Sequence, residues 1–370
     1  MNFFSEEKRL KILLGLGGCI VAAIVYLLVF AFDTELERNR EKIGFIILGD
    51  INEKGWNASH YNGIKAACDE FDVELLVRDH VRENSGQCPI AVRELADQGA
   101  GIIFLASFDY ASEVRSLMDE YPNIAFINTS TLEHAKNLTS CFARMYQGRY
   151  LSGVLAGMRT KSNVIGYVAA IPNAEVCRGI NAFTLGVQRV NPNAKILVMW
   201  TGDWQVEEVE EKHAQQLIEQ YGADVLTYHQ DEDAVGQVAK KYGVDFIGYN
   251  AQLDGYSDNY LTSIICHWDL YYKDILQKYF KGELIAIRDN WVGMHEGVIT
   301  LADYSNYVTP KMRSTLNSVS KELVDNDNLI FCGEIYDNQG NLRCAKNQVI
   351  SDMELLSRIN WLIKGVEVVE

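Results

Sequence analysis

Short apolar runs alternate with amphipathic stretches of helical length along most of this chain. The run at 42–48, KIGFIIL, is apolar throughout, and the stretch at 56–71 that follows it places apolar residues at helical spacing. The same alternation recurs with further runs at 73–78, 101–106, 124–128, 163–170, 194–200, 223–228 and 245–250. Uniformly apolar strands that are separated by helices indicate a parallel sheet covered on both faces. We therefore expect an α/β fold with two doubly wound, parallel-sheet lobes and a cleft between them.

A second feature is an uncharged N-terminal run of 21 residues at 12–32, ILLGLGGCIVAAIVYLLVFAF. A helix of this length matches a bilayer core of roughly 30 Å, so we expect a transmembrane helix within an N-terminal segment at 1–40. Basic residues precede the run and acidic residues follow it, which places the N-terminus in the cytoplasm and the body outside. The alternative is a lipoprotein signal that ends in LGGC, with Cys19 lipidated; either arrangement tethers the body to the cell membrane.

The charge and the motifs exclude several function classes. A net charge of -16 without a lysine and arginine cluster argues against a nucleic-acid partner. The sequence lacks the usual spacings for acyl transfer, phosphoryl transfer, dinucleotide binding and zinc hydrolysis. We therefore expect no enzyme activity, no cofactor and no catalytic residues.

The eight cysteines suggest at most one disulfide. No CxxC and no Cys/His cluster has metal-binding spacing, so we expect no metal site. Cys332 and Cys344 flank a turn sequence at 337–340 that could bring them together in a hairpin. Two unpaired buried thiols are an equally good interpretation.

Aromatic and amide side chains follow several of the predicted strands. In parallel sheets, ligands bind at the carboxyl ends of the strands, so these side chains are candidates for a ligand site. Rings from opposite lobes could stack on a planar ligand, while amides and carboxylates contact its edge. The candidates are Trp56, Asn57, Phe108, Asp109, Asn128, Trp204 and Asn250.

These segments resemble the basic membrane protein family, the nucleoside-binding lipoproteins that serve ABC transporters. The stretch NEKGWNASHYNG at 52–63 is similar to the family's DDKSFNQSAYEG-like segment, with Trp56 at the aromatic position and Asn57 at the amide position. Further segments resemble family motifs in the same order: 121–128, 148–170, 186–204, 221–230, 243–250 and 333–366.

The resemblance implies a type I periplasmic-binding-protein architecture. We expect an N-terminal lobe at 41–143 plus about 267–303, and a C-terminal lobe at 144–266 plus about 304–370. It also implies a receptor that takes a small aromatic, nucleoside-like ligand and passes it to an ABC transporter permease.

The sequence departs from the family pattern at several positions, one of which is Asn128, which stands in for an aspartate. Asn250 stands where the family has an aspartate that holds ribose hydroxyls, and Cys266 and His267 stand where it has a lysine. Loss of a carboxylate acceptor removes charge-assisted hydrogen bonds, so a purine riboside ligand is in question. His267 could donate to the ligand in place of the lysine. Because the family also includes a membrane-associated regulator of competence, the alternative is a regulatory or signalling protein that acts through protein partners.

Overall fold

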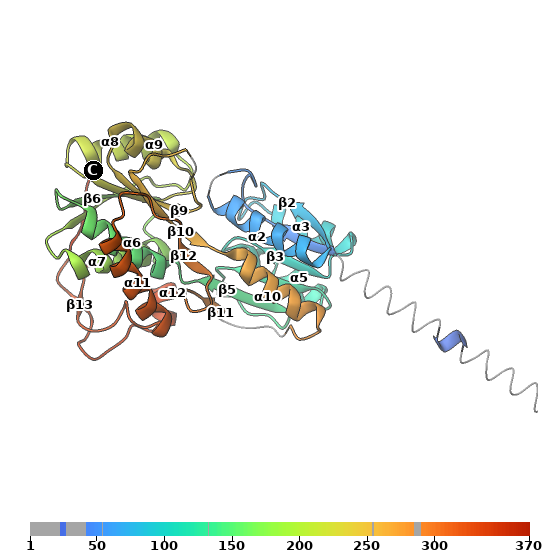
Figure 1. Cartoon of the computed structure of the whole chain (residues 1–370). Helices are drawn as coiled ribbons and strands as arrows, with labels where there is room; N and C mark the ends of the chain where they lie inside the picture. Colours follow the sequence, from blue (N-terminus) through green and yellow to red (C-terminus); the bar gives the residue numbers. More distant parts are fainter. Residues whose placement is uncertain (1–22, 27–41, 54, 132, 254, 285–289) are drawn as a thin grey trace, which may run out of the picture.

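The computed structural model describes residues 23–26, 42–53, 55–131, 133–253, 255–284 and 290–370, which form two lobes (Figure 1). The first lobe contains a six-stranded parallel sheet with the order β11-β5-β4-β3-β1-β2. Its strands are β1 (Lys42–Ile46), β2 (Glu74–Arg78), β3 (Ile102–Leu105), β4 (Ala125–Thr129), β5 (Leu138–Ala143) and β11 (Asn290–Val292).

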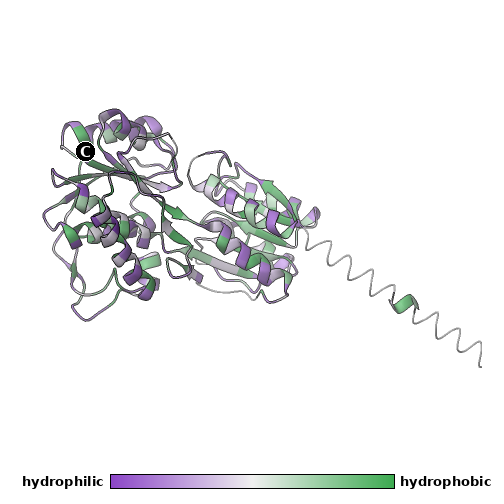
Figure 2. Cartoon of the chain, viewed as in Figure 1, coloured by the Kyte–Doolittle hydropathy of each residue, from purple (hydrophilic) through white to green (hydrophobic). Residues whose placement is uncertain are grey.

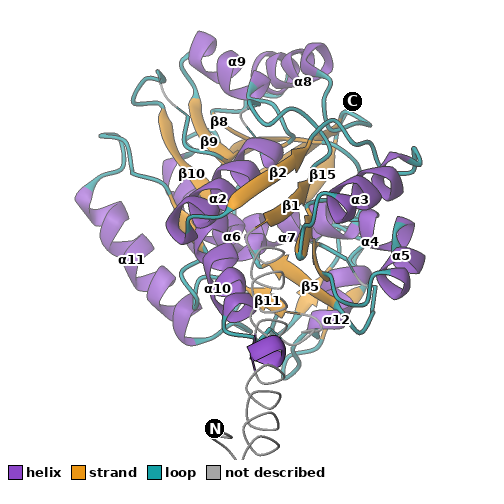
Figure 3. Ribbon diagram, turned by 90° about the vertical axis from the view of Figure 1, so that its right-hand side faces the viewer, coloured by secondary structure: helices purple, strands orange, loops and turns teal. Residues whose placement is uncertain are grey.

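Helices cover both faces of this first sheet (Figure 3). On one face α2 (Trp56–Phe71) packs beside α10 (Trp268–Phe280), against side chains such as Phe104. On the other face lie α3 (Gln87–Asp97), α4 (Tyr110–Glu113) and α5 (Arg115–Glu120), which share a separate apolar core with Ile103. Burial on both faces explains why the strands are apolar throughout instead of alternating.

The second lobe contains a seven-stranded sheet with the order β12-β10-β9-β8-β6-β7-β15. Only β12 runs antiparallel to its neighbour, β10. The strands are β6 (Val164–Ala169), β7 (Lys195–Trp200), β8 (Val225–His229), β9 (Asp245–Asn250), β10 (Tyr260–Cys266), β12 (Ile299–Leu301) and β15 (Val366–Val368). Together the two sheets confirm the predicted α/β fold with parallel-sheet lobes.

The helices of the second lobe also lie on opposite faces of the sheet (Figure 1). One face carries α8 (Glu207–Glu219) and α9 (Ala234–Tyr242); the other carries α6 (Met145–Arg159), α7 (Ala174–Val190), α11 (Pro310–Asp325) and α12 (Asp352–Ser357). Helices α6 and α7 approach each other at glycines. A Cβ at Gly153 would lie 2.0 Å from the Phe183 carbonyl oxygen, and one at Gly186 would lie 2.0 Å from that of Tyr150. Larger residues at these positions would force the two helices apart.

The chain crosses between the lobes three times, after β5, after β10 and after β11. The third crossing corrects one predicted boundary, because the first lobe ends near Val292 and not near residue 303. The reason is that β12 pairs antiparallel with β10 and so belongs to the second sheet. Crossings at one side of the molecule are the arrangement that a hinge between two lobes requires.

Hydrophobic residues concentrate in the strands of both lobes, and hydrophilic ones on the outward helix faces (Figure 2). Among the residues with a described position, no helix combines the length and the apolar character needed to cross a bilayer. The predicted span at 12–32, including Cys19, lies outside the described residues except for 23–26.

The predicted Cys332–Cys344 disulfide is not formed, and both residues are free thiols. In the hairpin of β13 (Ile335–Tyr336) and β14 (Leu342–Cys344), Cys344 pairs with Ile335, whereas Cys332 lies opposite Val349. The strand register therefore sets the two cysteines apart. Each thiol donates instead to a backbone carbonyl, that of Leu329 for Cys332 and that of Gln348 for Cys344.

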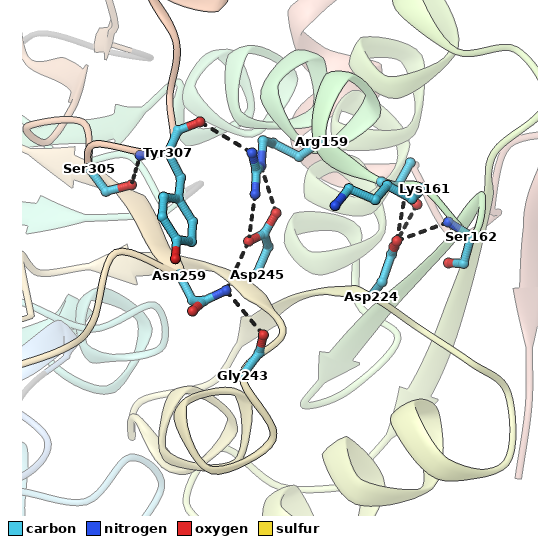
Figure 4. A network of polar contacts seen from close by, with 10 residues as sticks. Arg159, Lys161, Ser162, Asp224, Gly243, Asp245, Asn259, Ser305 and Tyr307 are labelled. Atoms are coloured by element: carbon cyan, nitrogen blue, oxygen red, sulfur yellow. Dashed lines mark hydrogen bonds and ion pairs between the residues drawn. The ribbon is translucent and has the colours of Figure 1, made fainter.

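The amino ends of β8 and β9 are closed by a polar network (Figure 4). Arg159, in the last turn of α6, pairs with both carboxylate oxygens of Asp245 at 2.7 and 3.0 Å. Asp224 accepts hydrogen bonds from the Thr160 hydroxyl and from the backbone N–H groups of Lys161 and Ser162. This network ties the end of α6 to the edge of the sheet that lies away from the cleft.

Candidate ligand-binding cleft

The carboxyl ends of the strands in the two lobes face each other, and their loops touch. Gly55, just before α2, contacts Asp231, just after β8: a Cβ at Gly55 would lie 2.1 Å from the Asp231 carbonyl oxygen. Beside this contact, the Gln205 side-chain nitrogen lies 3.4 Å from a Glu53 carboxylate oxygen and 3.5 Å from one of Asp231. The lobes are therefore closed along a seam formed by Glu53, Gly55, Gln205 and Asp231.

The carboxyl groups of Glu53 and Asp231 lie at this seam, and the pKa of each is raised. Burial raises the pKa of Glu53, although the hydrogen bond from the Asn57 backbone N–H acts in the opposite direction. Burial raises the pKa of Asp231 well above its usual range, and the nearby charge of Glu53 raises it further. Closure therefore disfavours the ionised forms of both groups.

Trp56 is the first residue of α2 and is held firmly in the first lobe. Its indole N–H donates to the Ala106 carbonyl at 3.0 Å, and its ring packs against His60 and Trp268, at centroid distances of 4.1 and 6.0 Å. The side chain is only partly buried. Because hydrogen bonding and packing fix its orientation, Trp56 can offer a planar ligand a rigid aromatic surface.

The side chains of Asn57 and Asn128 in the first lobe are fully buried, and in each only one of the two polar atoms has a hydrogen-bond partner among the described residues. The Asn57 side-chain oxygen accepts from the Gly49 N–H at 3.0 Å, but its amide nitrogen has no partner in the described part of the chain. The Asn128 amide nitrogen donates to the carbonyls of Ser107 and Thr129, while its oxygen is left without a partner there. One free donor and one free acceptor thus lie beside strand ends of the same sheet.

On the second lobe, an aromatic group surrounds the end of β8. The ring of His229 packs edge-on to Trp204 at 5.9 Å and tilts against Tyr249 at 4.5 Å. Its Nδ1 is buried without a partner among the described residues. Burial, reinforced by the positive charges of Arg149 and Arg178, lowers the pKa of His229 well below its usual value, so the ring is neutral.

Charged side chains lie beneath this aromatic group. Arg149 is fully buried, lies 3.6 Å from the Tyr249 ring centroid and donates to the Tyr228 carbonyl. Glu175 lies in the first turn of α7, and burial raises its pKa while Arg178 and Arg149 oppose the shift. The second lobe therefore brings both signs of charge to its side of the cleft.

A pocket of about 780 Å³ opens at the hinge side of the cleft, here called the lateral pocket. The first lobe contributes residues of α2 and the start of α10; the second contributes the ends of β9 and β10 and the strand β12. Asn250 and His267 both line it. Asn250 has a φ of +66°, a conformation that asparagine tolerates better than most residues.

The predicted site residues are thus divided between several positions. Asn250 and His267 line the lateral pocket, whereas Trp56, Asn57, Asn128 and Trp204 lie at or after strand ends and are not among its lining residues. Phe108 is 51% exposed, and Asp109 accepts a hydrogen bond from Asn84 within the first lobe. No group of three metal-ligating side chains is found in the described ranges.

Several polar residues of the cleft were not singled out from the sequence. They are Glu53, Arg149, Arg178, Gln205 and His229. His229 carried a detectable signal, because it ends an apolar strand. Arg149 and Arg178 carried none, because an arginine within a helix is usually solvent-exposed.

Comparison with known proteins places this fold among binding proteins. The family described as ABC transporter substrate-binding protein PnrA-like matches residues 40–339. A purine-binding protein from Brucella abortus is 28% identical over 88% of this chain and 93% of its own length. The transcriptional activator protein med from Bacillus subtilis is 22% identical over 82% of this chain and 94% of its own length.

Solved structures give the same fold at low identity. A transcriptional activator of the comK gene from Bacillus halodurans superposes with a TM-score of 0.69 at 23% identity, covering 77% of this chain and 98% of that protein. An ABC transporter solute-binding protein from Conexibacter woesei has a TM-score of 0.64 at 18% identity. The superposition covers 77% of this chain and 97% of that protein.

Proposed function

Because this chain belongs to the family of PnrA-like ABC transporter substrate-binding proteins, we propose that it captures a small aromatic, nucleoside-like solute between its lobes without chemically changing it. The proposal agrees with the name of the Brucella relative, which is a purine-binding protein. In this proposal Trp56 and Trp204 hold the flat part of the ligand, and polar groups at the strand ends contact its edge.

The observation that carries the proposal is the set of unpartnered polar atoms at strand ends of both lobes. The Asn57 amide nitrogen, the Asn128 oxygen and His229 Nδ1 are all buried without a hydrogen-bond partner in the described residues. A buried polar atom left unpaired costs about 1–3 kcal/mol, so native proteins rarely keep several together without a use for them. A purine edge offers donors and acceptors that could satisfy such atoms.

Closure of the lobes couples ligand binding to a change of shape. The three crossings can act as the hinge, and Gly55 permits the tight contact with Asp231. A ligand favours the closed form only through contacts that it makes there and not in the open form. Contacts with both lobes at once meet this condition.

We further propose that the body lies outside the cell, tethered to the membrane by the segment at 12–32 as a helix or by a lipid on Cys19. In this arrangement the closed, loaded form delivers its solute to an ABC transporter permease. The alternative is a membrane-anchored regulatory protein that acts through protein partners, and the relative named as a transcriptional activator favours it.

A binding screen with the full-length protein in detergent micelles tests the proposal. Purines, purine nucleosides, pyrimidine nucleosides and neutral sugars would be compared by thermal shift and then by calorimetry. A ligand at 100 times its Kd adds about 2.7 kcal/mol of stability, which raises the melting temperature measurably. Stabilisation by a purine or nucleoside and not by sugars is expected. If no compound stabilises the protein, the receptor function is wrong and the regulatory alternative gains support.

A further inference from the structure

The lateral pocket is strongly acidic. Four of its 21 lining residues carry a carboxylate: Glu53, Asp233, Asp269 and Asp303. Within the described chain, no lysine or arginine lines it, and the one titratable base is His267. The carboxylates come from both lobes, since Glu53 and Asp269 belong to the first and Asp233 and Asp303 to the second. Closure brings these carboxyl groups together, but because it also raises the pKa of Glu53, the negative potential of the closed pocket comes mainly from the three aspartates.

Neighbouring side chains neutralise this charge only in part. Asp269 lies 3.7 Å from Lys273 and 4.0 Å from His267, and Asp233 accepts a hydrogen bond from Tyr256. The ion pairs between described residues include neither Glu53 nor Asp303. Lys240 lies 5.4 Å from the Tyr256 ring but is not a lining residue.

A second, independent observation indicates that the pocket takes a ligand. Asn250 is only 7% exposed and lines the pocket, yet its side chain takes part in none of the hydrogen bonds found between described residues. An amide that is nine-tenths buried, lines the pocket and makes no hydrogen bond to a described residue is available to a group that enters the pocket. Glu53 lies at the boundary of the pocket and the seam, because it lines the pocket and its carboxylate is 3.4 Å from the Gln205 side-chain nitrogen.

We propose that the lateral pocket selects a cationic group on the ligand, an ammonium or another protonated amine, and rejects phosphate. This inference rests on the proposed function: the aromatic part of the ligand lies in the cleft, and its substituent extends past Glu53 into the lateral pocket. The Asn250 amide accepts from or donates to that substituent. The charge of the pocket sets the preference, because a cation gains and an anion loses energy among carboxylates that outnumber the basic groups beside them.

Three probes of one scaffold test the inference by calorimetry at low and high salt. They are adenosine, 5′-amino-5′-deoxyadenosine and adenosine 5′-monophosphate, which carry a neutral, a cationic and an anionic group at the same position. We expect the amine to bind about tenfold more tightly than adenosine, and the monophosphate at least about tenfold more weakly, with both differences reduced by salt.

A charge reversal in the pocket provides the matched variant. Asp303→Lys should weaken the amine and strengthen the monophosphate, each by about tenfold relative to adenosine measured with the same variant. Asp303 is exposed, so the fold should be retained. The control is Asp97→Lys on α3, an exposed position outside the pocket lining, which changes the net charge by the same amount.

The outcomes separate this inference from the proposed function. If adenosine and its amine bind equally, or if Asp303→Lys and Asp97→Lys act alike, the cationic selectivity is wrong while the receptor function stands. If none of the three probes binds, and the wider screen finds no aromatic ligand, the proposed function and this inference fall together.

Discussion

The two ends of the parallel strands in the second lobe are both polar, but they differ in how their polar groups are satisfied. At the amino end, Arg159 pairs with both oxygens of Asp245, and Asp224 accepts three hydrogen bonds (Figure 4). At the carboxyl end, His229 Nδ1 and Arg149 Nε are buried with no partner in the described ranges.

This difference separates a structural role from a binding role. Paired polar groups at the amino end hold α6 against the sheet and need nothing further. Unpaired groups at the carboxyl end carry a desolvation cost that a ligand can recover by bonding to them. We therefore expect substitutions at the amino end to change stability, and substitutions at the carboxyl end to change binding.

The largest expected effect is on stability, from Arg159→Met. The side chains of Arg159 and Asp245 are only 18% and 8% exposed, so the substitution leaves a nearly buried carboxylate without its counter-charge and with one side-chain hydrogen bond, from Asn259. Removing one partner of a buried ion pair costs about 3–5 kcal/mol. The urea midpoint of unfolding should fall accordingly, while ligand affinity of the folded protein stays the same.

The matched control for Arg159→Met is Lys195→Met. Lys195 pairs with Glu367 at 2.7 Å, but both side chains are more than half exposed, at 59% and 51%. Such a surface pair contributes at most about 1 kcal/mol. Equal destabilisation by the two substitutions, or a loss of ligand affinity in Arg159→Met, would break the proposed separation between the two ends.

The second largest expected effect is a loss of ligand affinity, caused by Trp56→Ala. Stacking of an aromatic side chain on a base contributes about 1–3 kcal/mol, so Kd measured by calorimetry should rise roughly ten- to hundredfold. Trp56→Phe serves as the control, because it keeps a ring while losing the hydrogen bond to Ala106. An unchanged Kd for folded Trp56→Ala would remove this residue from the site.

Much of this organisation could be predicted from the sequence, because it follows from local patterns. Uniformly apolar runs predict the strands, and Trp56 and Asn57 are candidates because they lie between the first strand and the body of the following helix. The third crossing was misplaced, since the short strand β12 owes its position to pairing with β10 over long range. Arg149 was missed for a similar reason: only the packing of α6 against β8 and β9 reveals that this arginine is buried.

The expected Cys332–Cys344 disulfide also depends on packing that local sequence patterns do not predict. A turn sequence predicts that a hairpin forms, but the register of its strands is set by side-chain packing as well as by the turn. Here the register shifts between Ile335 and Tyr336, and Cys332 comes to lie opposite Val349. Spacing along the chain alone could not distinguish this pairing from the one that joins the two cysteines.

The smallest expected effect is on closure itself and depends on pH. Asp231 follows β8, and burial at the seam together with Glu53 holds its pKa well above the ordinary range in the closed form. In an open form the carboxyl group would be hydrated, and its pKa would return toward about 4. A carboxyl group with a higher pKa in the closed form binds protons preferentially there, so lower pH favours closure. The closed form becomes more stable relative to the open form as the pH falls through the raised pKa of Asp231. This stabilisation stops increasing below the ordinary pKa of the open form.

Asp231→Asn should therefore close the ligand-free protein at pH 8 and weaken the pH dependence, although Glu53 retains part of it. Small-angle scattering would detect this as a smaller radius of gyration at pH 8 than in the wild type, with the two proteins converging toward pH 5. Asp97→Asn, at an exposed position on α3, controls for the change in net charge. If wild type and Asp231→Asn respond to pH identically, Asp231 does not govern closure, and the carboxyl end of the sheet differs from the amino end in ligand contacts alone.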